Sequence, residues 1–221
     1  MKTPVNAESL RHHLAYNWWK YLLILAVGFG LVDLVYSVTA YRPPREKTLG
    51  LYICGLSDDA KLTAYLDGVR ETELSDMEML SAQTLLQGDA YSSMQLTTYL
   101  AAGEGDIYAF TREDFLAFAE RGALVPLEGD EELTGIFDSA GVSLQSGWRR
   151  ETETGETHLY GIPLDKLPGF SQYIYVQDGF LAMTVTGGNA ENAGILMRIL
   201  CRDMIAAPPA EEPPPSAAPA E

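Results

Sequence analysis

One segment, Tyr91–Glu128, constrains the fold of this chain more than any other. Its first part places Leu96, Tyr99 and Leu100 at helical spacing, and glycines follow where such a helix would end. The run Asp106–Phe110 is short, apolar and bounded by turn residues, as expected for a strand buried on both faces. A helix, a buried strand and a second helix in this order predict an α/β fold with a mostly parallel sheet.

The second helix of this segment has sequence signals for both of its ends. Thr111 is suited to cap the first turn, where Glu113 and Asp114 would lie near unpaired backbone N–H groups that favour negative charge. Gly122 follows the last turn and would end the helix. One face would be buried, because it carries the apolar side chains of Phe115, Leu116, Phe118 and Ala119.

Two motifs in the chain resemble the first lobe of extracellular solute-binding proteins, which have the type II periplasmic-binding fold. They are LTTYLAAGEGDIYAF followed by FLAFAERGALVPL, at residues 96–110 and 115–127, and YGIPL at Tyr160–Leu164. The resemblance implies an α/β domain in which helices flank a mostly parallel sheet. It also implies solute binding as the class of activity, and it identifies no ligand.

The chain after the second motif is short for this family. Members of the family close two lobes on a ligand, whereas only about 40 residues separate Pro163 from the end of the last expected helix. A second lobe would need roughly another domain's worth of chain. We therefore expect a single lobe, without half of the surface that encloses ligands in the family.

An apolar run, Tyr21–Tyr41, precedes the expected domain. At about 1.5 Å per residue, a helix of this length spans roughly 31 Å, which is enough to cross the hydrocarbon core of a bilayer. Trp18 and Trp19 stand directly before it, as in the aromatic belt at a membrane interface. The sequence therefore predicts a single transmembrane helix over 21–41. Residues 1–20 would form a basic cytoplasmic tail, and the domain would lie on the extracytoplasmic side of the cell membrane.

Alternatives stay open for this run. Val38–Ala40 offers small residues of the kind found at a signal-peptide cleavage site. The run is longer than the apolar core of a typical signal peptide and has basic residues at both ends, so we favour an uncleaved anchor. Asp33, the one charged residue inside it, would either pair or carry protons, or be tolerated as a protonated or snorkelling carboxylate.

The remaining chain divides into a linker, a domain and a tail. Residues 42–47 contain two prolines and should form a stiff spacer, and 48–205 should form the domain. Residues 206–221 are rich in Pro, Ala and Glu and should be disordered. Within the domain, strands are expected at Thr48–Cys54 and Met77–Leu85, with a helix between them that Ser57 would cap.

The second half of the domain has weaker signals. Residues 128–146 read as an acidic loop with at most short helical pieces. Asn189 is suited to cap a last helix. Two hairpins are expected from paired short runs, 148–151 with 157–162, and 173–176 with 180–184 around Asp178-Gly179.

Charge and motif content exclude several classes of function. Residues 48–205 hold 25 acidic and 9 basic residues, hence a net charge of −16, which would repel the phosphate backbone of a nucleic acid. The chain has no hydrolase, phosphate-loop or metalloprotease motif, and His158 has no partner visible in the sequence, so we expect no enzyme. No metal-ligand spacing is present, so no cofactor is expected. Cys54 and Cys201 would form either a disulfide or two buried thiols.

A solute site would be expected at the carboxyl ends of the strands, because strand ends and helix N-termini meet there. The residues at those positions are Ser57, Asp58, Phe110, Thr111, Arg112 and Glu113. By resemblance, Phe110 and Glu113 stand where sugar-binding members of the family place a stacking aromatic side chain and a polar contact. The alternatives are that Ser57 and Thr111 only cap helices and that Phe110 packs in the core.

These patterns favour a membrane-anchored extracytoplasmic binding or sensing module that resembles one lobe of an ABC-transporter solute-binding protein. Its partners would be the membrane and a small-molecule solute, or a membrane transporter or other envelope protein. The alternative is a non-catalytic envelope scaffold that binds another protein and has lost ligand binding.

Overall fold

The structure is a computed structural model that describes residues 7–41, 43–86 and 90–208. The chain divides into two compact units, Met1–Arg42 and Pro43–Glu221, which we describe separately. The expected cytoplasmic tail and disordered tail lie partly outside the described residues, at 1–6 and 209–221.

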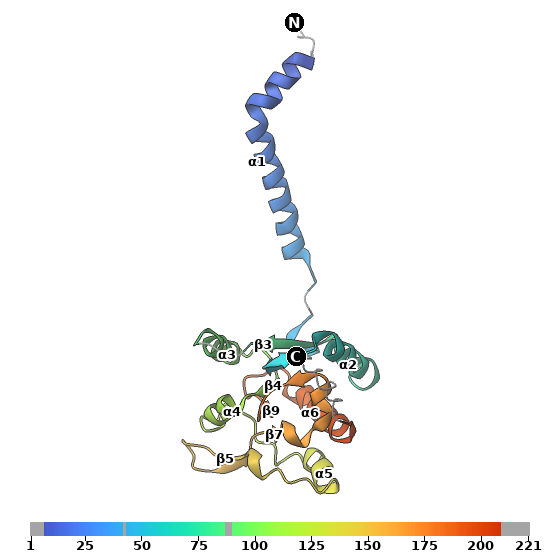
Figure 1. Cartoon of the computed structure of the whole chain (residues 1–221), viewed down its shortest axis with the longest axis vertical. Helices are drawn as coiled ribbons and strands as arrows, with labels where there is room; N and C mark the ends of the chain where they lie inside the picture. Colours follow the sequence, from blue (N-terminus) through green and yellow to red (C-terminus); the bar gives the residue numbers. More distant parts are fainter. Residues whose placement is uncertain (1–6, 42, 87–89, 209–221) are drawn as a thin grey trace, which may run out of the picture. The chain divides into compact units, whose positions relative to one another are not determined.

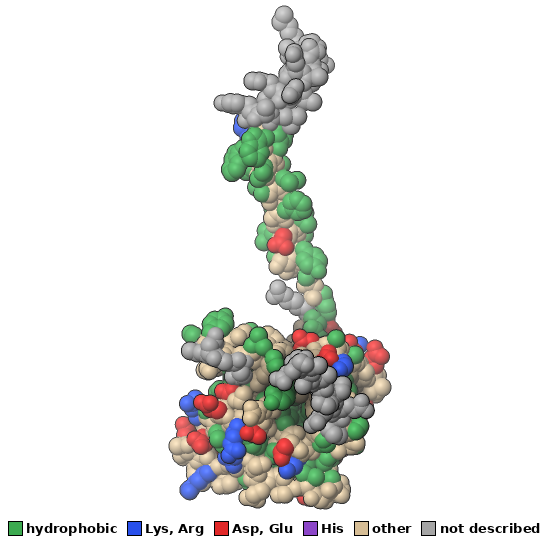
Figure 2. Space-filling view, viewed as in Figure 1, with side chains coloured by type: hydrophobic (Ala, Val, Ile, Leu, Met, Phe, Trp, Pro, Cys, Tyr) green, Lys and Arg blue, Asp and Glu red, His purple; other side chains and the backbone are tan. Residues whose placement is uncertain are grey.

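In the first unit, the described residues contain one long helix, α1, at Ala7–Thr39. Its segment Trp18–Thr39 has 22 residues and is long and apolar enough to cross a membrane. The side chains of this segment are exposed, and Figure 2 shows hydrophobic side chains along most of the helix. An isolated helix that presents apolar side chains on all sides is suited to an apolar environment.

The second unit is built around a five-stranded sheet in the order β3-β1-β4-β9-β7. Strands β3, β1 and β4 are parallel to one another, and β9 is antiparallel to both of its neighbours, β4 and β7. The predicted fold class is confirmed, because the sheet is mixed but mostly parallel and helices flank it. The strands are β3 at Met79–Leu85, β1 at Thr48–Cys54, β4 at Ile107–Phe110, β9 at Phe180–Met183 and β7 at Ile162–Pro163.

Helices cover both faces of this sheet (Figure 1). One apolar layer joins one face of β1 to α2 (Asp59–Thr72), α5 (Glu131–Ser139) and α6 (Ala190–Ala206). The other layer joins the opposite face to α3 (Ala90–Ala102) and α4 (Arg112–Ala119). Burial on both faces explains why the central strands are apolar throughout.

The two cysteines are buried and form no disulfide in the described part of the chain. Cys54 lies in the apolar layer beneath α3 and α4, whereas Cys201 lies in the layer beneath α2 and α6. Because the sheet separates the two layers, the side chains face different cores. Of the two possibilities left open by the sequence, the structure has two buried thiols.

The second predicted hairpin, 173–176 with 180–184, is wrong. β8 (Ile174–Tyr175) pairs instead with β2 (Leu56–Ser57), outside the main sheet. β9 pairs with β4, and all four of its residues are buried. An apolar strand of this kind is more stable between two strands than in an exposed hairpin, so β9 enters the sheet.

Residues 128–146, expected to be an acidic loop with at most short helical pieces, contain one helix of nine residues, α5. Asp130 caps it by accepting a hydrogen bond from the backbone N–H of Leu133 at 2.9 Å. The first predicted hairpin is confirmed, with β5 at Trp148–Arg150 and β6 at Thr157–Leu159. The described residues also form short 3-10 helices, η1 at Arg45–Lys47, η2 at Gln145–Gly147, η3 at Leu164–Lys166 and η4 at Pro168–Gln172.

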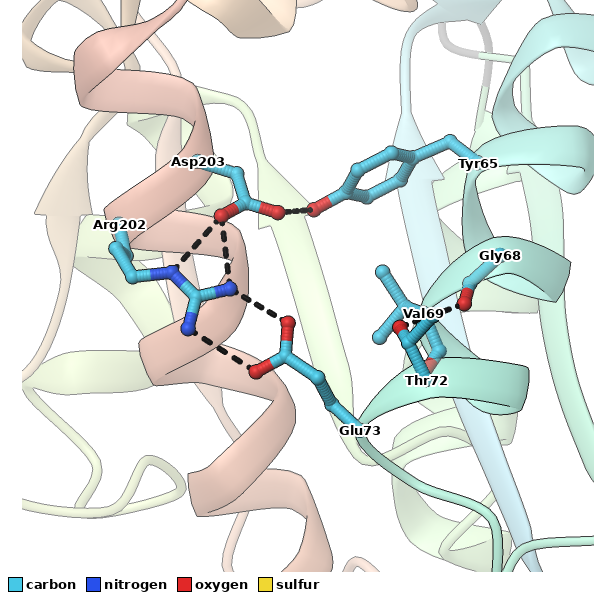
Figure 3. A network of polar contacts seen from close by, with 7 residues as sticks. All are labelled: Tyr65, Gly68, Val69, Thr72, Glu73, Arg202 and Asp203. Atoms are coloured by element: carbon cyan, nitrogen blue, oxygen red, sulfur yellow. Dashed lines mark hydrogen bonds and ion pairs between the residues drawn. The ribbon is translucent and has the colours of Figure 1, made fainter.

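A polar network joins the last helix to the first helix of the domain (Figure 3). The Arg202 guanidinium donates to both carboxylate oxygens of Glu73, at 3.0 and 2.6 Å, in a bidentate geometry. The Tyr65 hydroxyl donates to Asp203 at 2.9 Å, and Asp203 also accepts from Arg202. The pKa of Tyr65 is raised by burial and by this hydrogen bond to Asp203. These contacts fix α6 against α2.

The start of β4 is held by the buried carboxylate of Asp106. Its oxygens accept hydrogen bonds from the backbone N–H of Gly50 at 3.0 Å and of Asn189 at 3.2 Å. The Asp106 backbone also pairs with Gly50 and accepts from the N–H of Thr184 at 3.2 Å. Asp106 therefore joins β1, β4, the end of β9 and the start of α6.

Replacing Asp106 with alanine should destabilise the domain, because two buried N–H groups would lose their acceptor. We expect a loss of about 2 kcal/mol in the free energy of unfolding, and about half of that for Asp106→Asn, which keeps one carbonyl oxygen. Urea unfolding of the full chain in detergent measures both. The exposed Asp76 provides a control, since Asp76→Ala should change stability little. Equal stability of the Asp106 and Asp76 variants would contradict this role.

Candidate ligand site at the carboxyl ends of the strands

Two adjoining cavities open where β4 ends. The larger has a volume of about 560 Å³ and is bounded mainly by η3, η4, β8 and the loop before β9. The smaller has a volume of about 360 Å³ and is bounded by the start of α4 and the same loop. Arg112, Gln177 and Asp178 line both. The cavities thus lie at the edge of the sheet where the sequence placed a solute site.

The loop between β8 and β9 is packed tightly against the end of β4. A β-carbon on Gly179 would lie 2.9 Å from the carbonyl oxygen of Phe110 and 2.8 Å from Cδ1 of Leu164. The backbone N–H of Leu164 donates to the Gly179 carbonyl at 2.9 Å. Glycine is therefore needed here for a close approach of the backbone, and this approach sets the position of Gln177 and Asp178.

Thr111 and Glu113 line the smaller cavity. The Thr111 hydroxyl caps α4 as predicted, accepting from the backbone N–H of Asp114 at 3.3 Å and donating to its carboxylate at 2.8 Å. Burial raises the pKa of Asp114, and the hydrogen bond from Thr111 opposes this shift. Arg112 and Glu113 are exposed on the first turn of α4, where they can reach a bound molecule.

Ser57 and Asp58 line neither of the two cavities. Ser57 lies in β2, and its hydroxyl is hydrogen-bonded to Asp59 and Thr84. The expected cap is also shifted by one residue, because Asp58 and not Ser57 accepts from the backbone N–H of Lys61, at 3.2 Å. Hydrogen bonding to Lys61 holds the pKa of Asp58 below its ordinary value. Both side chains thus make their hydrogen bonds around the start of α2.

Phe110 is fully buried and lies in neither cavity. Its ring stacks on Tyr108, with the centroids 5.0 Å apart, and is tilted against Phe118 at 5.6 Å. This conformation corresponds to the alternative in which Phe110 packs in the core. A solute in either cavity would meet the loop before β9 and not the face of the Phe110 ring.

His158 has two carboxylate partners that the sequence did not reveal. Its Nδ1 lies 2.5 Å from Glu128 and its Nε2 lies 3.3 Å from Glu156. The hydrogen bond to Glu128 raises the pKa of His158. Because Glu128 also accepts from the backbone N–H of Leu159 at 3.0 Å, the pair anchors β6 and lies apart from the residues that line the cavities.

Sequence reasoning missed Gln177 and Asp178, which line both cavities. Asp178 has a positive φ of 49°, which asparagine and aspartate adopt more readily than most residues. From the sequence alone, the Asp-Gly dipeptide at 178–179 predicts a hairpin turn. The strand that follows the dipeptide, β9, pairs with β4, which is distant in the chain. The dipeptide alone therefore does not indicate that the turn lies beside Arg112.

No protein-family model matches the chain, and no curated protein matches it. Similarity is found among solved structures. A family 1 extracellular solute-binding protein from Alicyclobacillus acidocaldarius is 21% identical, with a TM-score of 0.39, over 55% of this chain and 29% of that chain. One from Bifidobacterium longum subsp. infantis is 21% identical, with a TM-score of 0.38, over 53% and 27%. NgtS, an N-glycan transport solute binding protein from Streptococcus pneumoniae, is 19% identical, with a TM-score of 0.38, over 52% and 24%.

All three of these solved structures are named as solute-binding proteins. The family resemblance seen in the sequence is therefore also present among solved structures, over about half of the chain. The chain spans between 24% and 29% of the length of these three proteins. Their activities, solutes and partners are accordingly proposals for this chain.

Gly179→Ala should disturb the site and destabilise the fold, because the added methyl group would press on the Phe110 carbonyl. We expect a loss of about 1–3 kcal/mol in the free energy of unfolding, as for other overpacked positions. Gly135→Ala is the matched control, since a β-carbon there meets no atom within 4 Å. Gly135 lies in α5, so alanine should stabilise it by about 0.5–1 kcal/mol. A Gly179 variant as stable as wild type in thermal unfolding would show that the loop is not held as described.

Proposed function

We propose that the domain is an extracytoplasmic binding or sensing module that holds a small solute at the carboxyl ends of its strands. The observation that carries the proposal is the larger cavity. Its volume of about 560 Å³ falls within the usual range of roughly 300–1,000 Å³ for small-molecule sites. Apolar side chains such as Leu167 and Phe170 line it together with Arg112, Gln177 and Asp178, which is the usual composition of such a site.

The first class of solute to test is taken from the neighbours in structure. NgtS is named for N-glycan transport, which makes sugars the first class to test. The exposed carboxylate of Asp178 and the amide of Gln177 suit the hydroxyl groups of a carbohydrate. A single lobe would leave one side of the solute open to water or to a second protein, so we expect weaker binding than in a closed two-lobed site. No catalytic step is proposed.

A thermal-shift screen of the full chain with sugars, amino acids and peptides tests this function. A solute that binds only the folded state must raise the melting temperature. Ser171→Trp should abolish the shift, because Ser171 is exposed and lines the larger cavity. Ser139→Trp is the matched control, since both hydroxyls donate to a carbonyl three residues earlier. A shift that survives Ser171→Trp would place the solute elsewhere, and no shift with any compound would count against solute binding.

We also propose that Trp18–Thr39 is an uncleaved membrane anchor. Its length, its exposed apolar side chains and the aromatic residues at its start support this role. We expect the full chain to stay in the membrane fraction after alkaline carbonate extraction, with its N-terminus intact by mass spectrometry. Deleting 18–39 should release it. A soluble product that begins at Tyr41 would instead identify a signal peptide.

The scaffold alternative has one observation in its favour. Tyr91 and Met94 are 73% and 71% exposed on α3, and Met94 lines a shallow groove with Thr97, Thr98, Ala101 and Ala102. Exposed apolar side chains of this kind often mark protein contacts. If no solute shifts the melting temperature, and Tyr91→Ser with Met94→Ser releases a co-purifying envelope protein, the scaffold is the better account.

A further inference from the structure

The arginines of the domain fall into two groups. Arg70, Arg198 and Arg202 form ion pairs with nearby carboxylates. The others make no ion pair among the described residues, although acidic residues outnumber basic ones 25 to 9 over 48–205. They are Arg112 and Arg121, on α4 and just after it, and Arg149 and Arg150, on β5. Figure 2 shows Lys and Arg side chains gathered over α4 and β5, with Asp and Glu side chains among them.

Arg112 is the unpaired arginine that reaches the candidate site. It is exposed, it is the first residue of α4, and it lines both cavities. The N-terminus of a helix adds partial positive charge at this point. The acidic residues around the openings do not cancel it through direct contact. Asp165 is paired with Lys166 at 2.8 Å, and neither Asp178 nor Glu113 forms an ion pair with Arg112.

Arg149 lies beside the same turn of α4. Its guanidinium carbon lies 5.8 Å from the centroid of the Phe115 ring, and Phe115 follows Arg112 by three residues, which is about one helical turn. The Phe115 ring stacks on Phe180, at 4.1 Å, and Phe180 lines the larger cavity. Arg149 itself lines neither cavity, and it lies behind Phe180, across the Phe115 ring.

The surroundings of Arg149 leave part of its hydrogen-bonding capacity unused. One terminal nitrogen donates to the carbonyl of Trp148 at 2.6 Å, whereas Nε is buried and has no partner among the described residues. Burial first, and then the charge of Arg112, lower the pKa of Arg149, while Glu120 opposes the shift. A buried donor without an acceptor is unfavourable, and so is the repulsion between two guanidinium groups. An anion bound nearby would relieve the repulsion.

We propose that Arg112 and Arg149 form a subsite for an oxyanion carried by the solute, with Arg112 in contact and Arg149 strengthening the positive field from behind. This inference rests on the proposed solute-binding function and narrows the solute to a class. Asp178 and Gln177 suit hydroxyl donors, and Arg112 suits a carboxylate or a phosphate, to which the guanidinium group offers two parallel donors. The solute is therefore an acidic sugar or a sugar phosphate, and not a neutral sugar.

Three related sugars test the subsite on the full chain: D-glucuronate, D-glucose 6-phosphate and D-glucose. We expect at least one of the acidic sugars to bind at least about tenfold more tightly than glucose, and the stronger of the two identifies the anion. Arg112→Gln should remove this advantage, and Arg149→Gln should reduce it severalfold. Arg121→Gln is the matched control, because Arg121 is also exposed and unpaired but lines neither cavity. The unliganded melting temperature of each variant shows whether it is folded.

Inorganic phosphate separates failure of the subsite from failure of the proposed function. At constant ionic strength, phosphate should raise the melting temperature of wild type and Arg121→Gln more than that of folded Arg112→Gln. The comparison between variants removes the general stabilising effect of phosphate on proteins. A phosphate effect without sugar binding would support the subsite and contradict solute binding of the kind proposed. Equal affinity for glucose and both acidic sugars would overturn the subsite and leave the function standing. No response to any of the four compounds would overturn the subsite, and the proposed function would then be decided by the wider screen with amino acids and peptides.

Discussion

The domain depends on the position of β4. Asp106 fixes the start of this strand, and the candidate site lies at its carboxyl end. The carboxylate of Asp106 ties the start of β4 to Gly50 in β1 and to Asn189 at the start of α6. From there, the four buried residues of β4 end at Phe110, directly before Thr111, which caps α4. A shift of β4 along the sheet would therefore move Thr111 and Arg112 relative to the loop that faces them.

The return of the chain through β9 completes the site. This strand runs antiparallel to β4, so the loop before it arrives at the end of β4 where α4 begins. The close contact of Gly179 with the Phe110 carbonyl holds the loop there, and its neighbours Gln177 and Asp178 become walls of both cavities. Residues 111–113 and 177–178 are thus brought together by strand pairing. The described residues of this unit thus form a concave surface at this edge of the sheet.

The sequence allowed the first half of the domain to be predicted because its signals are local. Thr48–Cys54 is a strand as expected, Thr111 caps α4, and Gly103 and Gly105 have the positive φ that ends α3. The structure of the second half was harder to predict from the sequence. An apolar run such as Phe180–Met183 is compatible with either a local hairpin or a strand of the central sheet. Only its long-range pairing with β4 decides between the two.

For the site, the sequence located the correct edge of the sheet but only part of its lining. Arg112, Thr111 and Glu113 line the cavities, whereas Ser57 and Asp58 are engaged at the start of α2 and Phe110 is buried. The sequence shows that a residue follows a strand and so places its backbone at this edge of the sheet. The direction in which its side chain points is decided by packing. Phe110 turns toward Tyr108 and Phe118 because an aromatic layer under α4 is available to it.

Hydrogen–deuterium exchange of the full chain, with and without a solute that raises its melting temperature, tests the central claim most directly. A solute at the carboxyl ends of the strands should slow exchange of the amides at Thr111–Asp114 and at Val176–Gly179. Slowed exchange confined to the exposed face of α3, or no change at either of these two segments, would contradict the account.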